Sequence, residues 1–68
     1  MADRGAAEYL RDHPLLNEIF DGMERDAMER AIYAKPDDDH TRRDALHHVH
    51  AIRDVRAELK RRAAPTTN

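Results

Sequence analysis

Cysteine and serine are absent from this sequence, and glycine occurs only as Gly5 and Gly22. Without cysteine the chain forms neither a disulfide nor a thiolate metal site. Two isolated glycines cannot form a glycine-rich phosphate-binding loop. The usual serine and cysteine nucleophiles are missing, and the carboxylates are spread along the chain. We therefore expect no enzymatic activity, no catalytic residues and no cofactor.

Long apolar runs and strand patterns are missing as well. No stretch approaches the roughly 18 consecutive apolar residues of a membrane span, and the first residues lack the apolar centre of a signal peptide. We expect a soluble, intracellular protein with no membrane partner. No segment alternates apolar and polar residues between turn signals, so the expected fold class is all-α.

The charges are divided unevenly between the two parts of the chain. Residues 1–40 contain eleven acidic and five basic side chains, whereas residues 41–68 contain three acidic and seven basic ones. This asymmetry favours folding of the basic part back onto the acidic part. A nucleic-acid-binding surface on the basic part is the alternative interpretation.

Two stretches have the periodicity of amphipathic helices. Between residues 41 and 63, mostly apolar side chains recur in alternating steps of four and three residues. This spacing predicts a single inner stripe along one side of a helix. Its members are Ala45, Val49, Ile52, Arg56, Leu59 and Ala63. Residues 14–34 repeat the pattern, and Ile19 and Ala31 broaden the stripe there. Its members are Leu16, Phe20, Met23, Ala27, Arg30 and Ala34.

Proline and aspartate mark the ends of these helices. Pro14 suits a first helical turn, so Asp12 or His13 is the expected N-cap. Residues 35–40 form an aspartate-rich turn, after which Thr41 and Asp44 resemble a capping box. A turn this short makes the flanking helices antiparallel neighbours.

The expected architecture is an antiparallel two-helix hairpin with a short additional N-terminal helix. Residues 6–12 form that short helix, and Tyr9 and Leu10 fill the open end of the hairpin. Residues 1–64 make one domain, and residues 65–68 are expected to be a disordered tail. A chain of 68 residues buries little surface and usually needs a partner or a staple.

The candidate partner-binding residues are apolar side chains that lie off the inner stripes. Met28 and Ile32 are four positions apart and form a second stripe, and Leu46 lies off the stripe of its helix. Arg30 and Arg56 interrupt the inner stripes with charge. We interpret one hairpin as an incomplete core, an oligomer or part of a complex, that binds a second copy or a larger protein.

Two other candidate sites use the charged residues. In the second-ranked reading, a dimer of hairpins binds RNA through Arg53, Lys60 and Arg61, although no aromatic residues accompany this basic cluster. His40, His47, His48 and His50 fall within eleven residues, but no further ligand completes a four-coordinate site. We expect no metal there.

The chain also resembles a known type of protein. The resemblance lies in the proline-started segment 13–20, the aspartate-rich turn with Arg42-Arg43-Asp44-Ala45, and segment 51–59. Over residues 13–60 the chain resembles short helical-hairpin proteins that tailed bacteriophages and prophages encode among their head and packaging genes. The resemblance implies a structural or adaptor protein of the virion or its assembly, acting by protein contacts in the bacterial cytoplasm or the phage particle.

Overall fold

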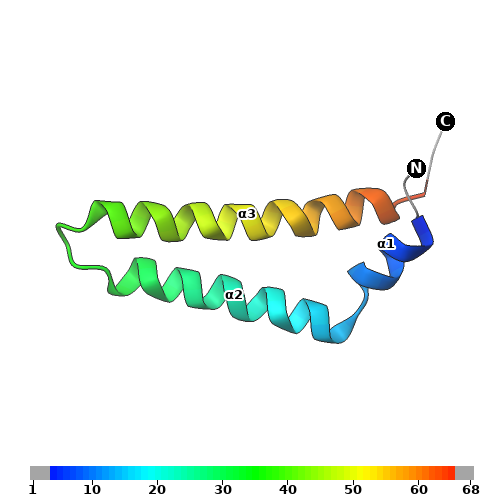
Figure 1. Cartoon of the computed structure of the whole chain (residues 1–68), viewed down its shortest axis with the longest axis horizontal. Coiled ribbons are helices and arrows are strands. Elements are labelled where there is room, and N and C mark those ends of the chain that lie inside the picture. The colour runs from blue at the N-terminus through cyan, green and yellow to red at the C-terminus, as the bar shows by residue number, and fades with distance from the viewer. Residues whose placement is uncertain (1–3, 66–68) are drawn as a thin grey trace.

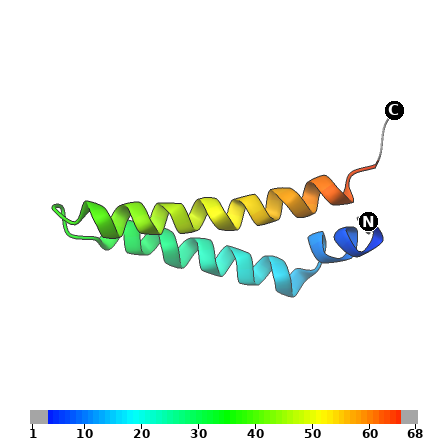
Figure 2. The same ribbon diagram turned by 45° about the horizontal axis from the view of Figure 1, so that its top comes forward.

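The computed structural model describes residues 4–65, and these form three α-helices connected by short turns. Helix α1 spans Arg4–Arg11, α2 spans Pro14–Tyr33 and α3 spans Asp39–Ala63. The described residues contain no strand, so the expected all-α class is confirmed. Helices α2 and α3 lie side by side and pack closely, while α1 lies mainly against the far end of α3 (Figures 1 and 2). The expected tail at residues 65–68 falls, apart from Pro65, outside the described residues.

The start of α2 follows from its proline. Pro14 occupies the first turn, where its missing N–H costs no hydrogen bond. His13 precedes it in an extended conformation and is the N-cap, because its Nδ1 accepts a hydrogen bond from the Leu16 N–H at 3.4 Å. The expected helix boundary and one of the two expected caps are therefore found.

The cap of α3 differs from the expected capping box. Asp38 is the N-cap, and its Oδ1 accepts a hydrogen bond from the Thr41 N–H at 3.1 Å. The Thr41 hydroxyl donates to the other oxygen of Asp38 at 2.7 Å. Thr41 is thus inside the helix, and Asp44 pairs with His40 instead of reaching back to a cap. The N-cap lies three residues earlier than expected, because an aspartate is a stronger cap than a threonine.

The buried interior is small and consists mainly of alanine. Among the described residues, the buried side chains larger than alanine are Val49 and Ile52 of α3. The remaining buried residues are Ala7, Ala27, Ala31, Ala45 and Ala63. Alanines allow the helix backbones to approach closely, but each buries little apolar surface. Most of the large apolar side chains therefore remain at least partly exposed.

The inner stripe of α3 is as expected, and that of α2 is as expected in part. Leu16, Phe20, Ala27 and Ala34 are buried or half-buried, but Met23 and Arg30 are exposed, and Glu24 lies on the inner side in place of Met23. The helix is turned by less than one position, and Glu24 supplies a carboxylate to Arg56 in the inner stripe of α3.

The contact made by α1 also differs from the expectation. Tyr9 is 67% exposed and Leu10 is 39% exposed, so neither fills the open end of the hairpin. Ala7 is the residue that α1 buries. The small side chain lets α1 lie close to α3, and Tyr9 and Leu10 are left facing solvent.

Candidate functional site

Two contacts between the helices define one broad face of the hairpin. Arg53 Nε donates to Glu24 Oε1 at 2.9 Å, and Arg42 Nη2 donates to the backbone carbonyl of Lys35 at 3.1 Å. We call this the ion-paired face. It is formed by Glu24, Met28 and Ile32 of α2 with Arg42, Leu46 and Arg53 of α3.

The three predicted partner-binding residues are brought onto this face. Met28 lies four residues from Glu24 and seven from Lys35, whereas Leu46 lies four residues from Arg42 and seven from Arg53. In the register set by the two contacts, Met28 and Leu46 therefore lie on the same face, with Leu46 about one helical turn nearer the connecting turn. Both are about 40% exposed.

Ile32 extends this apolar patch toward the connecting turn. It follows Met28 by four residues and is 69% exposed. Leu46 also lines a shallow hollow with Arg42, Arg43 and His50. Asp39 and His47 line the same hollow, and Asp39 pairs with Arg42 at 3.0 Å, so charges of both signs lie at the edge of the apolar patch.

The predicted nucleic-acid-binding residues are mostly paired with carboxylates. Arg53 contacts Glu24, and Arg61 donates two hydrogen bonds to Glu58, the Nε bond at 3.0 Å. Lys60 is exposed and has no ion pair within the described part of the chain. Because carboxylates already neutralise two of the three cations, RNA binding has no structural observation in its favour and stays a prediction.

The histidines of α3 do not come together as a ligand set. His40 Nε2 lies 3.2 Å from Asp44 Oδ2, and both side chains are exposed. His47, His48 and His50 are exposed as well. Within residues 4–65 no three histidine or carboxylate side chains are arranged to hold a metal ion.

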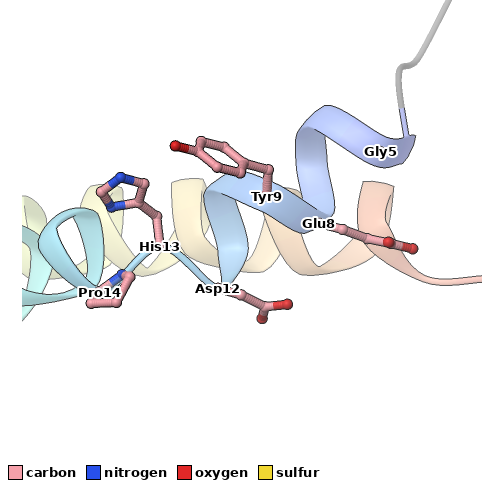
Figure 3. Close-up of a pocket in the computed structure, with 6 residues that line it drawn as sticks. All are labelled: Gly5, Glu8, Tyr9, Asp12, His13 and Pro14. Atoms are coloured by element: carbon pink, nitrogen blue, oxygen red, sulfur yellow. The ribbon is translucent and has the colours of Figure 1, made fainter.

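The corner between α1 and α2 contains an open hollow (Figure 3). Tyr9 and His13 lie on one side of it, with ring centroids 5.4 Å apart in an edge-to-face arrangement. Glu8 and Asp12 point to the other side. Their carboxylates pair with Arg4 and Arg11, at 3.0 and 2.8 Å. The Arg11 hydrogen bond lowers the pKa of Asp12, so this carboxyl is a poor proton donor or acceptor near neutral pH.

A second hollow at this corner was missed by the sequence analysis. Its walls are almost wholly apolar and come from Tyr9, Leu10, Leu15, Leu16 and Ile19, with His13 at the edge. Leu15 and Ile19 are spaced by four residues, the same signal that identified Met28 and Ile32. That signal was overlooked because Ile19 was assigned to the inner side of α2.

Comparisons with known proteins give no relative to guide the interpretation. No protein family, curated protein or solved structure matches this chain. None of the helices in the described residues is both long enough and apolar enough to cross a bilayer. The functional argument therefore depends on the surface itself.

Proposed function

We propose that this chain is a non-enzymatic structural or adaptor protein that binds another protein through Met28, Ile32 and Leu46. The supporting observation is the position of Met28 and Leu46 on one face, about one helical turn apart in the register set by the Arg53–Glu24 and Arg42–Lys35 contacts. The hairpin covers these side chains only in part: Met28 and Leu46 stay about 40% exposed and Ile32 stays 69% exposed. Their burial requires a second surface.

The working unit in this proposal is the antiparallel hairpin with α1 docked on it, as one domain over residues 1–64. The resemblance to phage-encoded hairpins supports a partner in the head or packaging apparatus of a tailed phage. The protein then acts in the bacterial cytoplasm during assembly or remains in the virion. No step of this role requires a cofactor, a metal or a catalytic residue.

A double variant tests the proposal. Met28→Ser with Ile32→Ser removes apolar surface from exposed positions, so helicity measured by circular dichroism should change little. Binding to purified head and packaging proteins of the source phage or prophage, measured by biolayer interferometry, should be lost. Glu18→Ser is the control for the serine substitutions, since Glu18 is an exposed residue of the same helix that belongs to neither the patch nor its surroundings. Unchanged binding by the double variant would discard this interface.

The RNA-binding alternative is separated by its salt dependence. Binding through phosphates weakens steeply as salt concentration rises and disappears when Arg53, Lys60 and Arg61 are replaced by glutamine. Contacts through Met28, Ile32 and Leu46 show little salt dependence, because apolar burial supplies their free energy.

A further inference from the structure

The two broad faces of the hairpin differ in chemistry. The described polar contacts between the long helices come from Arg42, Arg53 and Arg56. Their acceptors are Asn17, Asp21, Glu24 and two carbonyls of the connecting turn. All of these acceptors lie along the ion-paired side of α2 or at the turn. The opposite side has no such contact among the described residues.

That opposite side is occupied by large apolar side chains. Ile19 lies nine residues before Met28, which is half a turn around the helix, so the two point to opposite faces. Val55 is likewise about 200° around α3 from Arg53. Met23 lies one turn after Ile19 and next to Glu24, at the level of Val55. We call this side the apolar face. Its members are Tyr9, Leu10, Leu15, Ile19, Met23 and Val55.

The apolar face is continuous from α1 to the middle of the hairpin. Tyr9, Leu10, Leu15 and Ile19 line one apolar hollow, and Met23 extends it along α2. Each of the six side chains is between 39% and 67% exposed. A contiguous exposed apolar surface of this kind marks an interaction site.

The dimensions of the molecule show that it lacks the second layer of a typical domain. Domains normally consist of two packed layers, but the hairpin is a single layer of 49 × 26 × 16 Å. Its radius of gyration is 15.3 Å, against about 11 Å for a compact domain of this length.

The surface area leads to the same conclusion. The chain exposes 5516 Å², whereas a compact monomer of 7.9 kDa exposes about 4,400 Å². The excess, about 1,100 Å², exceeds the roughly 800 Å² that each partner contributes to a standard interface.

We propose that the apolar face is a self-association site, on which a second copy of this chain packs to form a two-layer, four-helix dimer. An apolar surface is complementary to itself, so two copies related by a two-fold axis bury the same residues on both sides. The charged contacts of the ion-paired face then point outward on both sides of the dimer. This arrangement leaves Met28, Ile32 and Leu46 accessible twice per dimer, so self-association and the proposed partner binding can each fail without the other.

The test compares two isoleucines on opposite faces of the full chain. Light scattering after size exclusion should give twice the chain mass of 7.9 kDa for the wild type. Ile19→Glu places a charge in the interface and should weaken the dimer at least about a hundredfold. Ile32→Glu is the matched control and should leave the dimer intact, since Ile32 lies on the ion-paired face. A monomeric wild type at high micromolar concentration, or dissociation by Ile32→Glu alone, would overturn the proposal.

A cross-linking experiment covers the case in which Ile19→Glu fails to fold. The chain has no native cysteine, so single cysteines give unambiguous products. Met23→Cys should form covalent dimers with a short bismaleimide cross-linker, and Met28→Cys should give no covalent dimer under the same conditions. The reverse pattern, or equal cross-linking of the two variants, would contradict packing through the apolar face.

Discussion

Arg56 of α3 donates a hydrogen bond from Nη1 to Oε2 of Glu24 on α2, across 2.6 Å. The same nitrogen lies 2.8 Å from Asp21 Oδ1, and the guanidinium carbon is 5.3 Å from the centre of the Phe20 ring. Arg53 binds the other oxygen of Glu24, so each oxygen accepts from a different arginine. The Glu24 side chain is 17% exposed and that of Arg56 is 28% exposed. Charge therefore replaces an apolar contact at this level of the hairpin, and Glu24 connects the two arginines: without it, Arg53 loses its carboxylate partner and Arg56 keeps Asp21.

The first prediction concerns the acid stability that Glu24 supplies. Hydrogen bonds from Arg53 and then Arg56 lower the pKa of Glu24 below its ordinary value of 4.5. A carboxyl with a lowered folded-state pKa stabilises the fold above its unfolded-state pKa, and this contribution is lost as the pH falls through the folded value. Thermal unfolding followed by circular dichroism should therefore show a smaller loss of stability below about pH 4.5 in Glu24→Gln than in the wild type. If the stability of the two proteins fell in parallel as the pH is lowered, the prediction would be contradicted.

The second prediction concerns Glu58 at the end of α3. Hydrogen bonds from Arg61 and then Arg62 lower its pKa from 4.5 to about 2. An NMR titration of the Glu58 carboxyl carbon should have its midpoint near that value. Arg61→Gln should raise the midpoint toward 4.5, because it removes the larger of the two contributions. Arg43→Gln removes an exposed arginine from the other end of the helix and should leave the midpoint unchanged.

The third prediction concerns the histidine cap of α2. The Nδ1 atom of His13 accepts the Leu16 N–H, which requires that this nitrogen carry no proton. His13→Ala should lower the free energy of unfolding by about 1 kcal/mol, a typical value for loss of a helix cap. His13→Ser keeps an acceptor at this position and should retain most of the stability. Urea unfolding measures the free energy of unfolding of both variants. Equal losses in the alanine and serine variants would show that the cap hydrogen bond contributes nothing.

The helices were predictable from sequence, but the rotation of α2 was not. The inner stripe of α3 is apolar except for Arg56, so spacing alone identifies it. In α2 the inner position belongs to Glu24, and a polar residue gives no hydrophobic signal. Its placement depends on Arg56 across the interface, a contact between residues 32 positions apart. The periodicity of one helix carries no information about which residue of another helix it will contact.

The same limit applies to the interaction surfaces. Met28 and Leu46 were identifiable because they lie off the inner stripes, but their position on one face follows only from the register between the helices. The apolar face was missed because Met23 was expected inside and proved to be 42% exposed. A small error in the rotation of α2 thus hid one of the two surfaces.

The fourth prediction concerns Gly22, which lies within α2. Glycine in a helix interior costs about 1 kcal/mol of stability relative to alanine, unless a close neighbour leaves no room for a Cβ atom. A Cβ atom built on Gly22 would have Arg25 Nη2 as its nearest neighbour, at an ordinary contact distance of 3.7 Å. Gly22 also has no positive φ angle that alanine would strain. Gly22→Ala should therefore raise the midpoint of thermal unfolding by about 4–8 °C.

Ala27→Gly is the matched control for this prediction, because it makes the reverse change one turn further along the same helix. Ala27 is fully buried, so its replacement removes a packed methyl group in addition to helix propensity. Its loss of stability should exceed the gain from Gly22→Ala. Destabilisation by Gly22→Ala would require a group packed tightly against Gly22. Within the described chain only the end of the Arg25 side chain lies near that position, at an ordinary contact distance. Such a result in a chain that light scattering shows to be dimeric would locate Gly22 in the contact between copies.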